Sequence, residues 1–593
     1  MTKLKTSYKT GGSFLVEPAT EAIVFSREDF TEEHRDIWGM VKEFDKERIF
    51  SQKEAIEKYD KDLSLSLIRE MGELGLLGID IPEKYGGMEL DKVTSAIVAE
   101  ALTFSPSFSV TWSVQTGIGV LPIIWFGTPE QKEKYLPKIA TGEMICAYGL
   151  TEPTAGSDAL AGKTTAVLSE DGNHYILNGE KIFITNGGWA DVFVVFAQVD
   201  GTKFSAFIVD RNTEGFSTGA EEKKMGMKGS STTPLIFQNA KVPAENLLYE
   251  VGKGATIAFN VLNIGRFKLG ASSVGGSKNA IEATSKYAKE RRAFGEPIAK
   301  FDAIIKKIAD MTVRTFSADS MVYRTIGLLQ NEIDQLDSSH PDYYIKSGEA
   351  MEKFAIETSM TKVYGSETSH FVVNEGLQIF GGYGFLEEYH MASAYRDDRI
   401  NQIWEGTNEI NRQIITGFMM KKALMEELPI REAVSKIDAF MSNGKLGNND
   451  GPLAAECETI ETGKRLALFV FNEALNTFGQ DLKHEQQITE MLADIFIDLY
   501  TAESTVVRAQ KIMDIGNQDR TVNSIAKIFT AEMVLRLLNL SLTAMNGIYG
   551  GQTTPIVFDK MRNFQAKMLM PTDIVNLKRE VAQKIFNQKE YPF

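Results

Sequence analysis

The chain has 593 residues, and its 64 lysines and arginines face 80 aspartates and glutamates, which gives a formal net charge of -16. This length allows several hydrophobic cores, since a domain usually contains about 100–200 residues. The acidic balance argues against nucleic-acid binding, although a local basic groove for a phosphate-bearing ligand stays open. The hydrophobic and charged fractions are typical of a folded soluble protein, so long disordered segments are not expected.

Cysteine and histidine usage excludes further classes of protein. Cys146 and Cys457 are the only cysteines and no CxxC occurs, which favours a reducing compartment over a secreted disulfide framework. The six histidines show no HExxH-like spacing, so no metal site is predicted. Residues 1–18 contain lysines but neither arginine nor an apolar core, which predicts no secretory signal and disfavours a mitochondrial transit segment. No run of about 18 apolar residues occurs, so no membrane span is predicted.

The chain begins with an expected extension, residues 1–29, and a helical domain, residues 30–146. EEHRDIWGMVKEFDKERIF and LSLSLIREMGELGLLG repeat apolar residues three and four apart, as amphipathic helices do. GTPEQKEKYLPKIATGE predicts a short helix with proline in its first turn.

The pattern changes to short strands over residues 147–253, which we expect to form a β-domain. HYILNGEKIFITNG, DVFVVFAQV, FSAFIVDR and TPLIFQNAKVP are rich in Val, Ile, Phe and Tyr, and turn residues separate them.

Helical periodicity returns after residue 253 and predicts a helical bundle domain over residues 254–425. A linker follows over residues 426–452, because NGKLGNNDGP (443–452) has linker composition. QQITEMLADIFIDLYTAESTVVRAQKIM then repeats apolar residues at helical spacing, which predicts a further helical domain over residues 453–593.

Common nucleotide-binding motifs are absent. GASSVGGSK (270–278) lacks the lysine of a P-loop and GGYGF (381–385) is not GxGxxG, and neither follows an expected strand. CAYGLTEPTAGSDA (146–159) offers hydroxyls and glycines that let a backbone approach a ligand closely. Composition alone allows two interpretations of this segment, a turn-rich linker or a ligand-contacting loop.

Six segments in order resemble the acyl-CoA dehydrogenase family, over roughly residues 30–425. They are CAYGLTEPTAGSDA, YILNGEKIFITNGGWAD, KMGMKGSSTTPLIFQNAKVPAENLL, RRAFGEPIAKF, QIFGGYGFLEEY and YRDDRINQIWEGTNEINRQII. The remaining third, with GGSFL near the start, is similar to the large very-long-chain branch that carries an extra C-terminal helical domain. The resemblance implies a mainly α fold: a helical N-domain, a central β barrel or sandwich, a four-helix-bundle domain and the C-terminal helical domain.

The resemblance also implies an FAD-dependent oxidoreductase that converts a fatty acyl-CoA to trans-2-enoyl-CoA in β-oxidation. A base removes the α-proton while the β-hydrogen leaves as hydride to the flavin. Glu405 matches that base, and desolvation beside Trp404 and the acyl chain would raise its pKa. Gly406 would let the backbone bend, and Thr407 would cap the next helix. Taken alone, Glu405 could instead complement a helix dipole on a surface turn.

Further residues of this chain match positions that contact FAD or acyl-CoA in the family. Residues implied to contact the flavin or the rest of FAD are Tyr148, Leu150, Thr151, Ser157, Phe183, Ile184, Thr185, Arg291, Phe294, Gln378, Gly381, Gly382, Thr407 and Glu409. Residues implied to lie at the acyl-CoA are Ser157, Asn263, Arg266 and Gly406. A β-core pair is the alternative for Phe183 and Ile184, and a helix-surface arginine is the alternative for Arg266. For the two consecutive arginines that begin with Arg291, the alternative is a solvent-exposed helix face.

Departures from the family pattern limit what is carried over. Gly265 stands where another branch has its carboxylate, which strengthens Glu405. Asp302 replaces a frequent flavin-contacting glutamine, so that contact is not expected. Trp404 is bulkier than the frequent Tyr or Phe, which leaves acyl length open; glycines in QTGIGVLP (115–122) and the resemblance to the large branch favour long chains.

The expected partners are acyl-CoA and electron-transferring flavoprotein. The resemblance implies a homo-oligomer, since the family's adenosine contacts come from a neighbouring subunit, and the extra C-terminal domain favours a homodimer over a tetramer. An oxygen-using acyl-CoA oxidase is disfavoured, because those enzymes commonly carry CGGHGY where this chain has FGGYGF. A scaffold protein of the same fold and a peripheral membrane contact of the C-terminal domain stay open. Bacterial cytoplasm is the expected compartment, with the mitochondrial matrix as the alternative.

Overall fold

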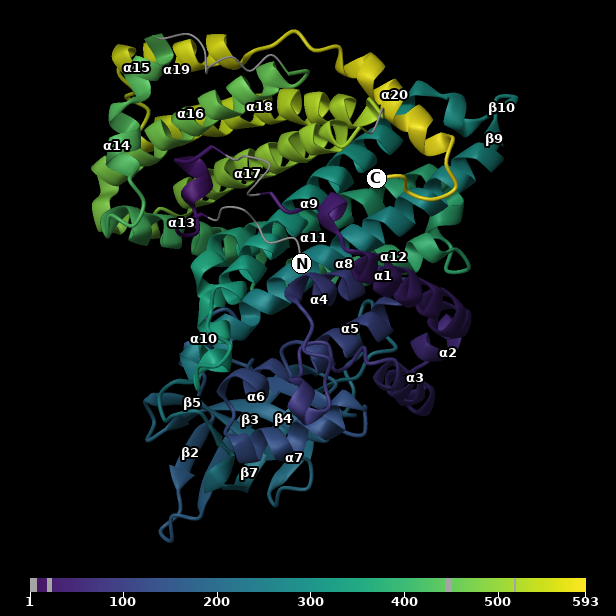
Figure 1. The fold of residues 1–593 in the computed structure, drawn as a ribbon, viewed down its shortest axis with the longest axis vertical. Helices are drawn as coiled ribbons and strands as arrows, with labels where there is room; N and C mark the ends of the chain where they lie inside the picture. The colour runs from purple at the N-terminus through teal and green to yellow at the C-terminus, as the bar shows by residue number, and fades with distance from the viewer. Residues whose placement is uncertain (1–7, 19–23, 443–450, 517–518) are drawn as a thin grey trace. The chain divides into compact units, whose positions relative to one another are not determined.

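The computed structural model describes residues 8–18, 24–442, 451–516 and 519–593 (Figure 1). The chain divides into two compact units, which are described separately. The sheet unit comprises Glu32–Gly275 and Glu332–Glu352, and the bundle unit comprises Met1–Thr31, Gly276–Asn331 and Lys353–Phe593. Helix α8 (Gly254–Glu290) and helix α9 (Asp302–Asp334) each contribute residues to both units.

The sheet unit begins with short helices, as the apolar spacing predicts. They are α1 (Glu32–Phe44), α2 (Lys53–Glu57), α3 (Lys61–Glu73), α4 (Lys92–Ala101), α5 (Pro106–Thr116), α6 (Leu121–Phe126) and α7 (Pro129–Ala140), and α10 (Tyr343–Ala350) packs on α6. Helix α7 starts where the sequence predicts: Thr128 and Gln131 form a capping box, and proline occupies the first turn.

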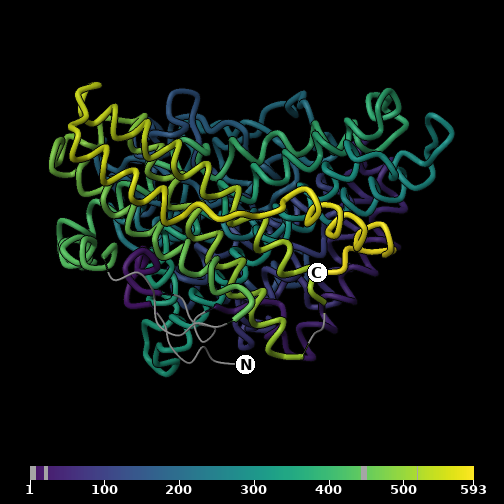
Figure 2. Tube along the Cα trace, turned by 90° about the horizontal axis from the view of Figure 1, so that it is seen from above, coloured from purple at the N-terminus to yellow at the C-terminus, as the bar shows by residue number. Residues whose placement is uncertain are grey.

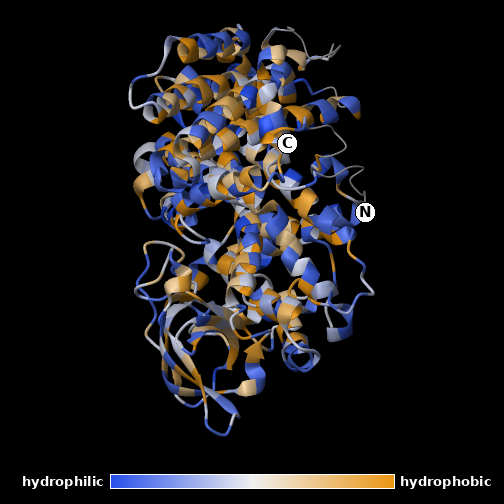
Figure 3. Ribbon diagram, turned by 90° about the vertical axis from the view of Figure 1, so that its left-hand side faces the viewer, coloured by the Kyte–Doolittle hydropathy of each residue, from blue (hydrophilic) through white to orange (hydrophobic). Residues whose placement is uncertain are grey.

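One mixed sheet forms the rest of the sheet unit. Its strands are β1 (Cys146–Gly149), β2 (Thr165–Leu168), β3 (His174–Thr185), β4 (Val192–Val199), β5 (Lys203–Asp210), β6 (Phe216–Thr218), β7 (Thr232–Pro243) and β8 (Leu247–Leu248). The order is β6-β7-β3-β2-β4-β5-β8, and β1 pairs with β4 in parallel. Strands β4 and β5 are buried along nearly their whole length, which explains their continuous apolar sequence. Figure 3 shows hydrophobic stretches of ribbon within the sheet.

The bundle unit is built from helices of very different lengths. They are the end of α8, most of α9, α11 (Ala355–Phe380), α12 (His390–Asp398), α13 (Asn408–Leu424), α14 (Ile430–Ser435), α15 (Ile437–Ser442), α16 (Ala454–Phe478), α17 (Gln486–Asp514), α18 (Thr521–Ile548), α19 (Pro555–Met568) and α20 (Ile574–Phe586), with a hairpin of β9 (Arg292–Ala293) and β10 (Glu296–Pro297). Helices α16, α17 and α18 pack side by side (Figures 1 and 2), and α13 packs on both α11 and α17.

A buried ion network connects the N-terminal segment to the long helices of the bundle unit. Arg324 of α9 is fully buried and donates to Glu503 (2.8 Å) and to the hydroxyl of Tyr8 (2.7 Å). The cited ion pairs and hydrogen bonds form two groups, which we together call the ion network: Tyr8, Arg324, Glu461, Lys464 and Glu503 in one group, and Arg27, Glu28, Lys278, Asp319 and Arg508 in the other. Burial alone would raise the pKa of Asp319, but Arg27, Lys278 and Arg508 hold it below its ordinary value.

The expected domain boundaries stay predictions, and residues 443–450 of the expected linker lie outside the described part of the chain. Two stretches reach the length and hydropathy of a membrane span, Pro106–Phe126 and Thr521–Ile548. The first is 78% buried and is interrupted between α5 and α6, and the second is 50% buried. Core helices pass the same test, so the absence of a span stays a prediction.

Candidate active site

Glu405 lies in a left-handed turn immediately before α13. Its φ is 56° and that of Gly406 is 80°, so two consecutive residues adopt the left-handed conformation. This conformation is unfavourable for glutamate by about 1–2 kcal/mol, whereas glycine adopts it without strain. The Glu405 side chain is half-buried, as is that of Trp404. The turn therefore holds its carboxylate in a strained and partly dehydrated position.

Side chains from two helices hold the backbone of this turn. Asn411 of α13 donates from Nδ2 to the carbonyl oxygens of Gly406 (2.8 Å), Thr407 (3.0 Å) and Glu405 (3.3 Å). Lys362 of α11 donates from Nζ to the Gly406 carbonyl at 2.8 Å. Neither residue was predicted from the sequence, in which Lys362 is a single lysine within the helical segment AIETSMTKVYG.

Thr407 caps α13, as the sequence predicts. Its Oγ1 accepts from the backbone N–H of Ile410 at 3.3 Å. Glu409 lies in the first turn, where a carboxylate complements the helix dipole. Its own backbone N–H and then the Thr407 hydroxyl hold the pKa of Glu409 below the ordinary value. Contacts of Thr407 and Glu409 with FAD stay predictions.

In the sheet unit, Phe183 projects from a bulge in β3. The pairing of β3 with β7 shifts by one residue between Lys181 and Ile184, and φ of Phe183 is 60°. The bulge separates the two apolar neighbours, since Phe183 is 63% exposed while Ile184 is buried. The interpretation of both residues as a β-core pair is therefore wrong for Phe183. Its exposed ring offers a flat apolar surface beside Thr185, which is half-buried.

The segment after β1 lies beside this bulge. The backbone N–H of Ile182 donates to the Thr151 carbonyl at 2.9 Å, which joins the 150–152 segment to β3. Tyr148 on β1 is buried, Leu150 and Thr151 are half-buried, and Ser157 is exposed. This hydrogen bond places Thr151 next to the residue that precedes Phe183, and the contacts of both residues with the flavin stay predictions.

A buried ion pair, not expected from the sequence, anchors the same segment. Lys181 donates to Glu152 at 2.6 Å, and Glu152 also accepts from the backbone N–H groups of Lys163 and Thr164. Burial lowers the pKa of Lys181, against the effect of Glu152. Burial also acts to raise the pKa of Glu152, but Lys181 and its other donors hold it below the ordinary value.

Asn263 and Arg266 lie one turn apart on the part of α8 within the sheet unit. Both are buried, and Arg266 donates from Nη1 to the Asn263 Oδ1 at 2.8 Å. Asn263 in turn donates to the carbonyl of Met351 at 3.4 Å. The alternative of a helix-surface arginine is therefore wrong. The expected roles at acyl-CoA, including an ion pair of Arg266, stay predictions.

The two segments expected to bind the rest of FAD meet in the bundle unit. The Arg291 guanidinium lies 5.5 Å from the centre of the Tyr383 ring, which belongs to GGYGF. Tyr287 stacks on Phe380 at 4.1 Å, next to Gly381 and Gly382. Exposed side chains surround this place, namely Arg291, Gln378 and Phe294, which is 96% exposed with φ of 52°. Tyr383 was quoted in the sequence analysis but not chosen as a site residue.

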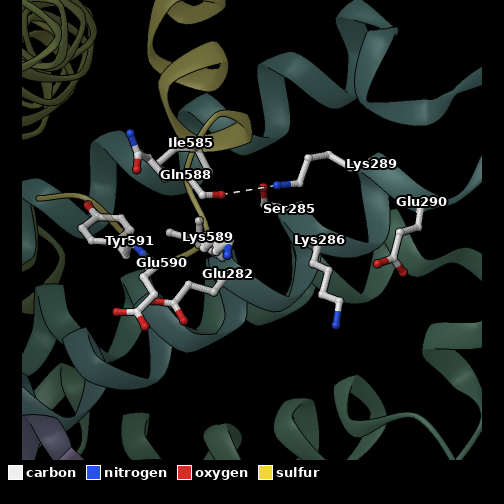
Figure 4. A pocket seen from close by; sticks show the side chains of 11 residues that line it. Glu282, Ser285, Lys286, Lys289, Glu290, Ile585, Gln588, Lys589, Glu590 and Tyr591 are labelled. Atoms are coloured by element: carbon white, nitrogen blue, oxygen red, sulfur yellow. Dashed lines mark hydrogen bonds between the residues drawn. The ribbon is translucent and has the colours of Figure 1, made fainter.

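A cavity of about 410 Å³ in the bundle unit is lined in part by the end of α8, directly before Arg291 (Figure 4). It is formed by α8 residues 281–290 and the final segment 585–591. Lys289 closes one side by donating to the carbonyls of Phe586 (3.0 Å) and Gln588 (3.3 Å). None of the expected site residues lines it. Among the described residues, no group of three or more His, Cys, Asp or Glu side chains is arranged to hold a metal ion.

Asp302, which stands where many family members have a flavin-contacting glutamine, forms an ion pair with another residue of the chain. Arg579 of α20 donates from Nε to the Asp302 carboxylate at 3.0 Å, and the pair is exposed. The Asp302 pKa lies below its ordinary value because of the Arg579 hydrogen bond. The expectation that Asp302 makes no flavin contact stays a prediction, and the ion pair gives a structural reason for the aspartate.

Comparisons with known proteins agree over nearly the whole chain. Four family models match: "Acyl-CoA dehydrogenase, N-terminal domain" at residues 31–143, "Acyl-CoA dehydrogenase, middle domain" at 147–240, and two models described as "Acyl-CoA dehydrogenase, C-terminal domain" at 252–420 and 462–563. The "Probable acyl-CoA dehydrogenase" of Bacillus subtilis (strain 168) is 42% identical over the full length of both chains.

Two further proteins are similar over most of this chain. The mitochondrial very long-chain specific acyl-CoA dehydrogenase of Rattus norvegicus is 37% identical over 79% of this chain and 72% of its own. The crystal structure of an acyl-CoA dehydrogenase complexed with FAD from Bacillus anthracis superposes with a TM-score of 0.96, at 42% identity, over 99% of this chain and 100% of that one. The expected fold class is confirmed, and the chain belongs to the acyl-CoA dehydrogenase family.

Proposed function

We propose that this enzyme, an FAD-dependent oxidoreductase, converts long-chain fatty acyl-CoA to trans-2-enoyl-CoA in β-oxidation, with Glu405 as the base that removes the α-proton. The observation that carries this proposal is the strained turn at Glu405, directly before the capped start of α13. Strained backbone of this kind persists where the surrounding structure fixes it, and it clusters at functional sites.

The exposed groups fit FAD. The Phe183 ring offers a face for stacking, and Thr151 beside it offers a hydroxyl and backbone for a polar ring edge. In the bundle unit, the exposed Arg291 guanidinium and the exposed backbone of Gly381 and Gly382 suit the pyrophosphate. Bound FAD supplies a two-electron acceptor for the hydride that leaves the β-carbon.

Glu405 performs the proton transfer. Its carboxylate takes the α-proton, the electron pair of that C–H bond forms the new Cα=Cβ double bond, and the β-hydrogen departs with its own electron pair. A carboxylate of ordinary pKa near 4.3 is a weak base for a carbon acid, so exclusion of water by Trp404 and the acyl chain would strengthen it. Gly406 gives the turn the left-handed backbone that aims the carboxylate.

The other expected site residues complete the proposal. Asn263 and Arg266 would support the thioester end from α8, where they are already joined by a hydrogen bond. Tyr148, Leu150, Ser157, Ile184, Thr185, Phe294, Gln378, Thr407 and Glu409 would complete the surfaces around flavin and acyl-CoA.

Electron-transferring flavoprotein is the proposed electron acceptor, and a homodimer is the proposed assembly. The 96% exposed Phe294 and the 82% exposed Phe385 suit burial by a second subunit, since large aromatic side chains are rarely this exposed. Sedimentation of the purified enzyme tests the dimer. The bacterial cytoplasm is the proposed compartment.

Anaerobic titration with acyl-CoAs of graded chain length tests the function. We expect the purified protein to be yellow, and we expect long-chain acyl-CoA to bleach the flavin fastest. Admitting air to the reduced enzyme should form hydrogen peroxide slowly, whereas rapid peroxide formation would favour the oxidase. Flavin that no acyl-CoA reduces would contradict the proposal and favour a scaffold role.

A further inference from the structure

The turn at Glu405 is held by an unusually placed buried lysine. Lys362 of α11 is fully buried, and its Nζ donates to the Gly406 carbonyl (2.8 Å) and to the Asn408 Oδ1 (2.7 Å). Placing an ammonium inside a protein costs several kcal/mol, so such groups are retained where their hydrogen bonds are well formed. These two bonds reach both ends of the turn, since Gly406 follows Glu405 and Asn408 begins α13.

The hydrogen bonds around Lys362 converge on one carbonyl. Asn411 donates to the same Gly406 oxygen at 2.8 Å, so the oxygen receives two side-chain donors, one from α11 and one from α13. A carbonyl held from two sides cannot rotate without losing both bonds. Glu405 directly precedes Gly406 in the same turn. Rotation of the Gly406 carbonyl would therefore change the backbone of the turn and redirect the Glu405 side chain.

Other buried lysines of the bundle unit have carboxylate partners. Lys464 is bonded to Glu461 and Glu503, and Lys278 is bonded to Asp319. Two acceptors of Lys362 are a backbone carbonyl and an amide oxygen, so its ammonium holds a turn through hydrogen bonds.

We propose that Lys362 is a positioning residue for α-proton abstraction: it fixes the Gly406 carbonyl, together with Asn411, so that the Glu405 carboxylate is aimed at the α-carbon. This inference rests on the proposed role of Glu405 as the base. Lys362 itself takes no proton from the substrate.

The Lys362→Met variant tests the inference, because methionine keeps the length and volume of the side chain. Both acceptors keep a donor in this variant: Asn411 still bonds the Gly406 carbonyl, and the Ser366 hydroxyl still bonds Asn408 Oδ1 at 3.3 Å. The protein should therefore fold and keep its FAD. The matched control is Lys278→Met, a buried lysine whose partner Asp319 keeps Arg27 and Arg508.

Anaerobic stopped-flow with saturating long-chain acyl-CoA measures flavin reduction, and titration with the enoyl-CoA product measures binding. We expect Lys362→Met to slow reduction about 100-fold, since a displacement of about 1 Å at a reacting group costs about that much. Product affinity and FAD content should stay within about two-fold of wild type. Lys278→Met should reduce its flavin at the wild-type rate.

Each alternative outcome has one meaning. A wild-type reduction rate in Lys362→Met, with Glu405→Gln inactive, overturns the inference and leaves the proposed function intact. A parallel loss of rate and thermal stability in both lysine variants overturns it as well, because it indicates general destabilisation. Rapid flavin reduction by Glu405→Gln overturns the proposed base and this inference together.

Discussion

The turn at Glu405 and the ion network of the bundle unit both contain a buried lysine, but they use it differently. In the ion network, Lys464 faces the carboxylates of Glu461 and Glu503, and almost every charge is matched by an opposite one. At the turn, Lys362 donates a hydrogen bond to the backbone carbonyl of Gly406, and the neighbouring residue Glu405 is only half-buried. The ion network joins distant segments, whereas the turn presents a single acidic group.

The difference teaches that burial of charge is not by itself a sign of function. A buried salt bridge is weak evidence for stability, yet removing one partner is strongly destabilising. Strain is the better indicator here, because Glu405 has a left-handed backbone and Lys362 and Asn411 both donate to the carbonyl of the next residue, Gly406. Variants on each side should separate loss of stability from loss of activity.

The largest expected loss of stability follows Arg324→Met in the ion network. Arg324 is fully buried, and its removal leaves Glu503 with Lys464 and takes a donor from Tyr8. We expect the free energy of unfolding to fall by about 3 kcal/mol, at the lower end of values for a broken buried pair. Urea unfolding followed by circular dichroism measures this loss.

The matched control for this prediction is Arg579→Met, which breaks the exposed pair with Asp302. Exposed pairs contribute little, so the urea midpoint should not change measurably. Flavin reduction below the transition should be normal in both variants. An Arg324→Met protein that is as stable as wild type would remove the contrast between the two regions.

A pH-dependent effect of similar size is expected at Glu357 of α11. Glu357 is fully buried, and burial raises its pKa to about 7, although the backbone N–H of Gly12 donates to it at 2.7 Å and the charges of Arg324 and Lys422 oppose the shift. The folded pKa is above the unfolded value, so the stabilising contribution is complete below about pH 4.5 and is lost as pH rises to about 7.

The Glu357→Gln variant should therefore gain stability relative to wild type as pH rises. The difference between the two proteins should grow by about 3 kcal/mol from pH 5 to pH 8, since each pKa unit corresponds to about 1.4 kcal/mol. Urea unfolding at pH 5, 6, 7 and 8 measures it. Burial also raises the pKa of Asp45 in the sheet unit to about 7. Titration of Asp45 changes the stability of both proteins equally, so it cancels from their difference. A difference that is constant with pH would contradict the prediction.

The smallest expected loss of stability follows Thr407→Ala at the turn. Removing this N-cap should cost about 1 kcal/mol and loosen the start of α13, which would slow flavin reduction. Thr554 caps α19 in the same way, so Thr554→Ala should lose similar stability without slowing reduction. Thermal unfolding and stopped-flow reduction provide the two measurements. Equal reduction rates in both variants would show that the cap at Glu405 has no special role.

Local sequence patterns predicted the elements well because periodicity and capping act over short distances. The capping box of α7, the strands of the sheet and the cap at Thr407 all follow from neighbouring residues. Contacts between distant residues did not follow, such as that of Arg324 with Tyr8, 316 residues earlier. The bulge at Phe183 also escaped prediction, because a shift in register depends on the partner strand β7.

The same distinction between local patterns and contacts of distant residues applies to the candidate site. The resemblance selected Glu405, and the ordering of the six motifs gave the FAD segments, two of which meet at Arg291 and Tyr383. Lys362, which donates to the Gly406 carbonyl, lies 44 residues from Gly406 in the chain, and no local sequence pattern indicates this contact.

Anaerobic stopped-flow of Glu405→Gln with long-chain acyl-CoA is the most direct test of the proposed chemistry. The amide keeps the size of the side chain but cannot accept the α-proton. We predict that flavin reduction falls by about 10²–10⁴-fold, which is the usual contribution of a general base, while FAD content and enoyl-CoA affinity are unchanged. A Glu405→Gln enzyme that reduces its flavin as fast as wild type would show that another residue removes the proton.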